Sequence, residues 1–227
     1  MSSPHAELRL DWCSHEAARY ACERWHYSKT IPTNRTNQIG VWEDAKYCGA
    51  IVFGLGSSPS LGTAYGLSIF QVCELVRVAL REHSNPVSKM LSIAVRMLIR
   101  KNQGLQLIVS FADPMHEHHG GIYQANGWLY SGTTSVGSIW LMPDGTLIDP
   151  RRFNGHGFNA PKRVPRSAKQ LRTPGKHRYL LPLNAEMWAR IAPLSQPYPK
   201  RVKQATDAHP ASGGGAAPTH TLHINVA

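Results

Sequence analysis

A carboxylate and a histidine-rich loop follow directly on an apolar run, and here the sequence first offers chemistry. Leu105–Phe111 is rich in strand-forming residues and is stopped by Asp113 and Pro114, a pattern typical of a buried central strand. In open α/β sheets ligands bind beyond the carboxyl ends of the strands, so Asp113 is a candidate hydrogen-bond acceptor or general base. The alternative is that Asp113 only caps the helix that follows.

The loop behind Asp113 raises the question of a metal. It contains His116, His118 and His119, and His26 lies on an earlier element. Two histidines and a carboxylate are a ligand set suited to open-site redox metals such as iron. Loop histidines are also commonly exposed to solvent without binding anything, so both interpretations stay open.

Arg77 is a charged residue in an unexpected place. It lies inside Glu74–Leu80, a run too apolar to be exposed on both faces, and a buried guanidinium is costly without a partner. We therefore expect Arg77 either to meet a ligand anion or to pair with Glu74 or Glu43.

The elements that position these residues can be predicted from periodicity, turn residues and caps. We expect, in order, a strand at Leu8–Asp11, a helix from the N-cap Ser14 to Trp25, a hairpin of Ile39–Glu43 with Tyr47–Phe53, and a strand at Glu74–Leu80. Next come a helix with Asn85 as N-cap and Pro86 as its first residue, the strand Leu105–Phe111, and a short helix at Ile122–Asn126 ended by Gly127. A further strand starts at Trp128, and a hairpin of Ser138–Met142 with Thr146–Ile148 follows it. After a stretch without periodicity at 151–175, a strand is expected at Arg178–Leu183 and a helix at Asn184–Ile191.

The charge is unevenly distributed along the chain. Residues 1–150 hold 12 Lys and Arg against 12 Asp and Glu, whereas residues 151–203 hold 13 Lys and Arg against Glu186 alone. Such a basic segment suits a polyanion, because each phosphate contact releases counterions. The alternative is a solvated basic tail without a partner.

Cysteine spacing and hydropathy bear on the compartment. Cys13, Cys22, Cys48 and Cys73 show no CxxC spacing, so we expect reduced core thiols instead of disulfides or a zinc site. The sequence has no run of 18 apolar residues and no signal-peptide pattern. We expect a soluble cytoplasmic protein without a membrane partner.

The order strand, helix, hairpin, strand, helix, strand, helix, strand resembles that of the GNAT acyltransferase fold. In that family the fourth strand contacts the donor's pantetheine arm, and the next loop and helix N-terminus bind its pyrophosphate. The resemblance makes four residues candidates for cofactor binding: Val78, Ala79, Ser88 and Lys89. Ser88 is alternatively a capping residue. The loop lacks the family's glycines, which weakens the case for a coenzyme A donor.

Two sequence features extend the resemblance. Tyr123 to Trp128 resembles the family's Tyr-x-x-x-Gly-aromatic signature, which implies that Tyr123 can protonate a leaving group. Several longer blocks in one order resemble the Mom family of phage-encoded DNA-modification proteins: His26-Tyr27-Ser28, Ile39-Gly40-Val41-Trp42-Glu43, Phe53-Gly54-Leu55-Gly56, Glu74 to Leu80, Ser110 to Pro114 and His119 to Gln124. This resemblance covers roughly Leu8 to Leu183.

The Mom resemblance implies a function and roles for its residues. It implies a mixed α/β sheet flanked by helices in a GNAT-like fold, and transfer of a carbamoylmethyl group to N6 of adenine in double-stranded DNA, which protects phage DNA from restriction enzymes. Asp113 would accept the proton of the amino group, and Tyr27 or Trp42 would stack on the flipped base. His26 and His119 lie in matching blocks, which favours them as iron ligands.

The donor is left open between acetyl-CoA and an activated glycine such as glycyl-tRNA. A glycyl group on N6 is an isomer of the carbamoylmethyl product, and a rearrangement would link them. The basic segment suits tRNA as well as DNA. A homodimer also stays open.

The predicted organisation is a disordered stretch at 1–7, a GNAT-like catalytic domain at 8–150, a basic DNA-binding extension at 151–194 and a disordered tail at 195–227. The candidate DNA contacts are the basic residues of the extension, namely Arg151, Arg152, Lys162, Arg163, Arg166, Lys169, Arg172 and Lys176.

Two other functions are compatible with parts of the sequence. Phe53-Gly54-Leu55-Gly56 and Asp113-Pro114 are similar to the S-adenosylmethionine loop and the acid-Pro motif of adenine-N6 methyltransferases, although Pro59, Gly62 and Gly66 stand where such an enzyme needs a helix. The basic segment alone would suffice for a non-enzymatic DNA-coating protein.

Overall fold

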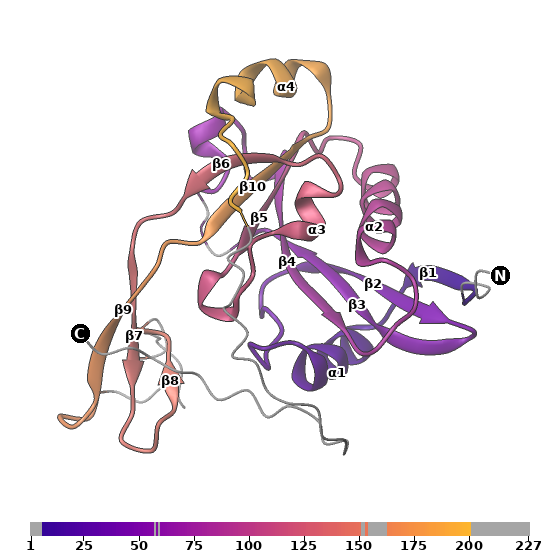
Figure 1. Ribbon diagram of the computed structural model, residues 1–227. Helices are drawn as coiled ribbons and strands as arrows, with labels where there is room; N and C mark the ends of the chain where they lie inside the picture. The colour runs from indigo at the N-terminus through magenta and orange to yellow at the C-terminus, as the bar shows by residue number, and fades with distance from the viewer. Residues whose placement is uncertain (1–5, 57, 59, 151–152, 154–162, 201–227) are drawn as a thin grey trace, which may run out of the picture.

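The computed structural model describes residues 6–56, 58, 60–150, 153 and 163–200 (Figure 1). The predicted disordered ends fall outside these residues except for 6–7 and 195–200. Three predicted DNA contacts, Arg151, Arg152 and Lys162, also fall outside them.

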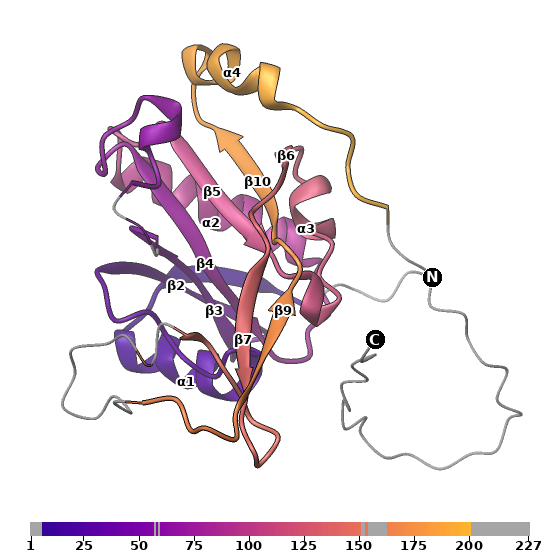
Figure 2. The same ribbon diagram turned by 90° about the vertical axis from the view of Figure 1, so that its left-hand side faces the viewer.

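A seven-stranded mixed sheet forms the centre of the fold (Figures 1 and 2). Its strands in spatial order are β1 (Leu8–Trp12), β2 (Thr36–Glu43), β3 (Lys46–Gly54), β4 (Val72–Leu80), β5 (Leu107–Ala112), β10 (His177–Pro182) and β6 (Leu129–Thr133). Only β4 and β5 pair in parallel. The predicted fold class, a mixed sheet flanked by helices, is confirmed.

Helices cover both faces of the sheet. α1 (His15–Trp25) starts at Ser14, whose hydroxyl accepts the Ala17 N–H, as predicted. α1 packs on β3 and β4 through small side chains, which lets it lie close to the sheet. The opposite face is covered by α2 (Val87–Lys101) and α3 (Gly121–Gln124), and α4 (Ala185–Ile191) closes a second apolar cluster. Short 3-10 helices lie at Thr63–Tyr65 (η1), Pro114–His116 (η2) and Ala192–Leu194 (η4).

The start of α2 differs from the prediction. Asn85 is not its N-cap, because the cap residue is Pro86 and no side chain caps the helix. The Asn85 amide instead donates to Glu43 Oε1 and to the Ala6 carbonyl. The main-chain N–H groups of Ser84 and Asn85 also donate to the Glu43 carboxylate, at 2.8 and 2.7 Å. A charged acceptor from the β2–β3 hairpin therefore outcompetes the capping role of Asn85.

The parallel pair β4 and β5 comes apart halfway along its length. The strands pair from Val72 with Leu107 to Leu75 with Ser110, although β4 runs on to Leu80 and β5 to Ala112. At this point Val76 is an extra residue in the β3–β4 ladder, a bulge that bends β4. The divergence opens a space between the two strands.

A small antiparallel sheet projects from the main sheet, and we call it the wing (Figures 1 and 2). It consists of β7 (Gly137–Leu141), β8 (Leu147–Ile148) and β9 (Lys169–Thr173), in the spatial order β8-β7-β9. The β7–β8 hairpin was predicted, whereas β9 was not. The segment around β9 shows no apolar alternation because four of the five strand positions are polar.

The four cysteines are free, as expected, and three of them are buried. Burial raises the pKa of Cys22 to about 11 and that of Cys73 to about 12, so both stay as unreactive thiols at neutral pH. None of the helices in the described part of the chain is long and apolar enough to cross a membrane.

Candidate active site

A cleft of about 530 Å³ occupies the space where β4 and β5 diverge. Leu75–Val78 of β4 form one wall, Phe111 and Ala112 of β5 another, and Tyr27 and the segment 117–123 complete it. The cleft reaches Val87, the first residue of α2. The bulge in β4 and the early end of β5 therefore produce the cavity, at the carboxyl end of the parallel strands where ligands are expected.

Tyr123 lines this cleft and is largely buried in the core, with 7% of its surface exposed. The Ser110 hydroxyl donates to the Leu75 carbonyl at 2.9 Å, and its oxygen lies 2.8 Å from the Tyr123 hydroxyl. Burial raises the pKa of Tyr123 to about 12, so the phenol keeps its proton at neutral pH. The position fits the predicted role as a proton donor, which stays a prediction.

Asp113 lies at the end of β5, directly after the cleft residue Ala112. One carboxylate oxygen accepts the Met115 N–H at 3.0 Å and caps η2, so the capping interpretation holds. The other oxygen lies 2.8 Å from Lys176 Nζ. Asp113 directly follows the cleft residue Ala112 but does not itself line the cleft. Its role as a general base stays a prediction.

Tyr27 stands among three imidazole rings. Its ring centroid lies 4.2 Å from that of His26 and 3.9 Å from that of His116, each at a tilt near 30°. His118 meets it edge-on at 5.4 Å. Two such short face contacts need both faces of the phenol ring, so a flipped base could stack on Tyr27 only by displacing a histidine. Trp42, the other stacking candidate, packs under Arg9.

Arg77 contributes a positive charge to the cleft wall. Its guanidinium donates to the main-chain carbonyls of Thr30, at 3.0 Å, and Val76. The bond to Thr30 fastens β4 to the loop after α1. Glu43, one of the two expected partners, is bound instead to the loop at 84–85.

The cofactor-binding candidates do not share one environment. Val78 lines the cleft, whereas the Ala79 side chain is buried on the α1 face of the sheet. Lys89 Nζ donates to Asn85 Oδ1 at 3.0 Å. Ser88 lies in the first turn of α2 without capping it. Their role in cofactor binding stays a prediction.

The sequence model of the Mom protein family matches residues 7–200, which span every helix and strand from β1 to η4. The chain belongs to the Mom protein family. No curated protein matches the sequence significantly.

Solved structures similar to this Mom-family chain are acyl-transferring proteins of low sequence identity. An acetyltransferase from Bacillus subtilis in complex with CoA is 14% identical, with a TM-score of 0.46, over 78% of this chain and all of the other. The N-acyl amino acid synthase FeeM from uncultured soil microbes is 11% identical, with a TM-score of 0.46, over 83% and 97%. An aminoglycoside acetyltransferase, AAC(6')-Ib, in complex with coenzyme A and kanamycin is 10% identical, with a TM-score of 0.45, over 82% and 99%.

The predicted iron site at His26 and His119 is not supported. Within the described residues, no three His, Cys, Asp or Glu side chains are grouped to hold a metal ion. His26 Nδ1 accepts the Ser28 N–H at 3.1 Å, so the neutral ring carries its proton on Nε2. A nitrogen that binds a metal needs a free lone pair, which the protonated Nε2 lacks. His116 and His118, and not His119, approach His26 around Tyr27.

Two residues of the site were missed at the sequence level. Ser110 binds Tyr123, and its signal was a hydroxyl inside an apolar strand. Lys176 was assigned only to DNA, yet its ammonium reaches Asp113 from a segment 63 positions away, and no local pattern announces such a contact.

Proposed function

We propose that this Mom-family protein transfers a carbamoylmethyl group to N6 of adenine in double-stranded DNA and thereby protects phage DNA from restriction. The observation that carries the proposal is the pairing of two proton-handling groups around one cleft. Tyr123, which keeps its proton at neutral pH, lines the cleft, and Asp113 directly follows the cleft residue Ala112. Transfer to an amine needs both a proton acceptor and a proton donor.

In the proposed reaction Asp113 and Tyr123 each transfer one proton. The lone pair of adenine N6 is delocalised into the ring, so the amine needs an acceptor for its proton while the new N–C bond forms. Asp113 takes this proton in the proposed mechanism. As the bond between the electrophilic carbon and its leaving group breaks, the Tyr123 hydroxyl donates its proton to the leaving group, and Ser110 holds that hydroxyl in place.

The size of the cleft suits a base taken out of the duplex. About 530 Å³ falls in the range of roughly 300–1,000 Å³ that is typical of small-molecule sites. Flipping costs a few kcal/mol, which stacking and edge contacts recover. Phe111 lines the cleft and also packs against the second apolar cluster, whereas Tyr27 is 40% exposed but already stacks with two histidines.

For the donor, the loop before α2 favours an activated glycine over acetyl-CoA. Attack of N6 on the glycyl carbonyl carbon gives an N6-glycyl group, an isomer of the carbamoylmethyl group, which must then rearrange to the product. The amides of Ser84 and Asn85, which follow β4 where a pyrophosphate would bind, are already occupied by the Glu43 carboxylate. An anion of the donor would have to displace this internal anion. Growth on isotopically labelled glycine should therefore label the modified base, and an unlabelled base would rule this donor out.

The deciding experiment is mass spectrometry of nucleosides from DNA of cells that express the protein. A carbamoylmethyl adenosine that is absent with the Asp113→Asn variant is the expected result. Methylated adenosine would instead support the methyltransferase alternative. That alternative lacks structural support, because β3 runs into a loop and the 3-10 helix η1 where a methyltransferase has a helix. Unmodified but protected DNA would support a DNA-coating protein.

A further inference from the structure

The wing carries a polar face that the proposed chemistry does not use. In the β7–β9 ladder, Ser138 lies opposite Arg172 and Trp140 opposite Gln170. Directly opposite residues share a face, as do residues two apart on a strand, so these four side chains lie on one face. Gln170 and Arg172 are both exposed, and Gln170 Nε2 donates to Ser138 Oγ at 2.9 Å. The neighbouring positions Lys169 and Leu171 lie on the opposite face.

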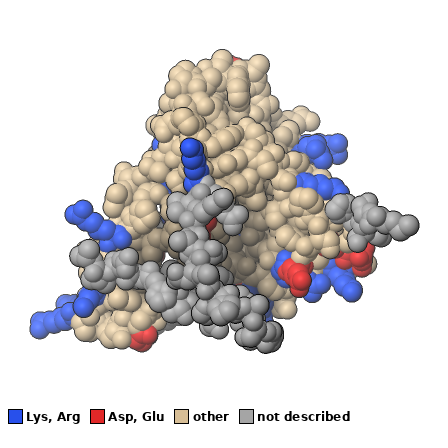
Figure 3. All heavy atoms as spheres, in the orientation of Figure 1, with Lys and Arg blue, Asp and Glu red and all other residues tan. Residues whose placement is uncertain are grey.

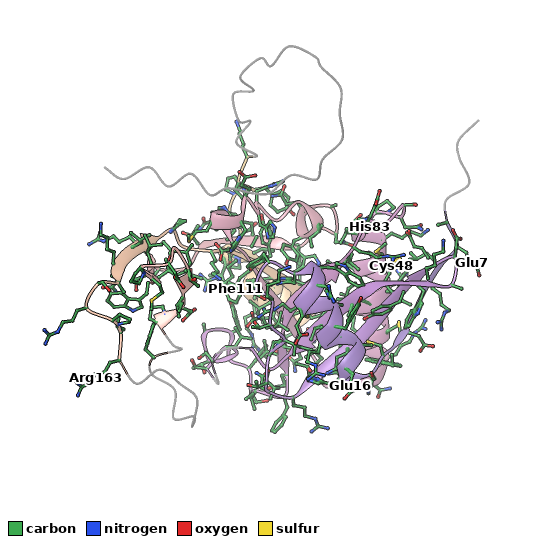
Figure 4. The ribbon with its side chains drawn as sticks, turned by 90° about the horizontal axis from the view of Figure 1, so that it is seen from below. Glu7, Glu16, Cys48, His83, Phe111 and Arg163 are labelled. Atoms are coloured by element: carbon green, nitrogen blue, oxygen red, sulfur yellow. The ribbon has the colours of Figure 1, made fainter. Side chains whose placement is uncertain are left out.

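The charge of the wing suits DNA. The wing and the described segments that join its strands to each other and to the main sheet (134–150, 153 and 163–176) include five Lys and Arg, namely Arg163, Arg166, Lys169, Arg172 and Lys176, and two acidic residues, Asp144 and Asp149. In Figure 3 Lys and Arg side chains project from this side of the molecule, and in Figure 4 Arg163 lies at the outer end of the wing, away from Phe111 in the domain. A basic element that projects from a domain can approach phosphates without the domain in the way.

The shape of the wing selects the groove. The wing has three strands, but β8 has only two residues, so its β7–β9 pair forms the two-stranded part. A two-stranded β-ribbon fits the major groove, which is about 12 Å wide, and not the minor groove of about 6 Å. Residues two apart on a strand are separated by about 7 Å, close to two base-pair steps of about 3.4 Å each. Gln170 and Arg172 are therefore spaced to meet bases two steps apart.

The base of the wing is joined to the active site. Thr134 N donates to the Lys176 carbonyl and Lys176 N to Thr134 Oγ1, both at 2.9 Å, so the ribbon continues from β6 and β10. Lys176 also binds Asp113. Gln170 is six positions from Lys176, at most about 20 Å along a strand, or about six base pairs. DNA on the ribbon would thus reach the cleft within that span.

We infer that this face enters the major groove beside the target adenine and selects the flanking sequence, with Arg172 binding a guanine edge and Gln170 an adenine edge. Arginine pairs in bidentate fashion with guanine O6 and N7, and glutamine with adenine N6 and N7. The inference rests on the proposed function only in taking DNA as the substrate. It assigns sequence choice to the wing and leaves the chemistry to the cleft.

The test compares Arg172→Lys and Gln170→Ala with the matched control Lys169→Ala, an exposed residue on the opposite face of the same strand. Modified adenines are mapped by sequencing, and binding to a library of duplexes is measured by selection. Arg172→Lys keeps the charge but loses the bidentate pair, so preference at one flanking position should fall roughly 10- to 100-fold. Lys169→Ala should weaken binding to all duplexes alike.

An unchanged sequence preference in both test variants would overturn the inference, as would an equal loss on all duplexes in all three variants. The library arm needs no modification chemistry, so it still decides the inference if no modified adenine is found. In that case the proposed reaction is rejected, and the duplex selection alone decides whether the wing reads bases. Circular dichroism of each variant checks that the exposed substitutions leave the fold intact.

Discussion

The ammonium of Lys176 lies 2.8 Å from the outer oxygen of Asp113, and so a residue at the base of the wing holds the carboxylate beside the cleft. The inner oxygen is fixed by the Met115 N–H. Asp113 is thus oriented from two sides, once by its own turn and once by a distant segment. Lys176 is half-exposed, so a DNA phosphate can compete for it.

Asp113→Asn should abolish transfer without unfolding the protein. The asparagine oxygen still accepts the Met115 N–H, but it cannot take a proton from adenine. We expect modification to fall at least about 100-fold. The free energy of unfolding should change by less than about 1 kcal/mol, because an ion pair with a half-exposed lysine contributes little. Nucleoside mass spectrometry and urea denaturation measure the two effects, and full activity in this variant would remove Asp113 from the mechanism.

The Tyr123→Phe variant distinguishes the role of the Tyr123 hydroxyl as a proton donor from the role of its ring in packing. The ring stays in the core and only the hydroxyl is lost, so stability should fall by about 1 kcal/mol, the usual contribution of one hydrogen bond. Transfer should fall by about 100-fold or more. Ser110→Ala is the control, since it removes the partner of the phenol but not its proton. If Tyr123→Phe lost no more activity than Ser110→Ala, the hydroxyl would have only a structural role.

The tyrosine also predicts behaviour at alkaline pH. Its pKa is raised to about 12 in the folded state, above about 10 when unfolded, so the folded state keeps a proton that the unfolded state loses. The associated stability is complete below pH 10 and is lost as the pH rises towards 12. Denaturant midpoints between pH 9 and 11 should therefore decline less steeply in Tyr123→Phe than in the parent protein. Equal slopes would contradict this.

Local sequence patterns predicted the elements whose ends are fixed by neighbouring residues. The Ser14 cap and the β2–β3 hairpin each depend on a few neighbouring residues, and each was found where expected. Gly127 is left-handed, but α3 ends at Gln124, two residues before the predicted end at Asn126. The prediction that Asn85 caps α2 failed because its partner, Glu43, lies 42 positions earlier in the sequence, where no local pattern reveals the contact.

Contacts between distant segments account for the rest. β10 lies between β5 and β6, with Leu180 paired to Val109, so the last strand is inserted between two earlier strands. The predicted extension therefore includes a strand of the main sheet. Asp113 and Tyr123 were identified from sequence because the strand end and the aromatic signature are local. The cleft itself was not, since it results from a bulge in β4 that no residue type specifies.

Acid should destabilise the protein through His26. Burial, with Arg77 as a second cause, lowers the pKa of His26 to about 3, whereas the unfolded value is about 6.5. The unfolded state therefore binds a proton first, and stability present above pH 6.5 is lost as the pH falls towards 3. At pH 5 the loss is about 2 kcal/mol. His26→Asn, which keeps an acceptor for the Ser28 N–H, should remove this loss between pH 7.5 and 5 in denaturant titrations; an undiminished loss would assign it to other groups, such as His116 and His118.

Gly175→Ala should misplace the wing. A Cβ at this position would lie 1.9 Å from the Thr134 carbonyl oxygen, so the two strands at the base of the wing must move apart. Affinity for duplex DNA should fall at least about 10-fold, because the basic residues of the wing lose their common alignment. Gly104→Ala is the matched control, since nothing lies within 4 Å of its Cβ. Gel-shift titrations at fixed salt compare the two, and equal affinities would show that the wing does not depend on this close approach.

Coenzyme A should not bind with its pyrophosphate at the loop before α2. Glu43 accepts three hydrogen bonds there, from the main-chain N–H groups of Ser84 and Asn85 and from the Asn85 amide, so the donors that a phosphate needs are occupied. Isothermal titration of the parent protein with coenzyme A should give no saturable heat. Glu43→Ala frees these donors but leaves them partly buried, at a cost of about 1–3 kcal/mol for each unsatisfied group, and that variant should be less stable. Saturable binding by the parent protein would instead restore an acyl thioester as the donor, and Glu43 would then have to move aside when it binds.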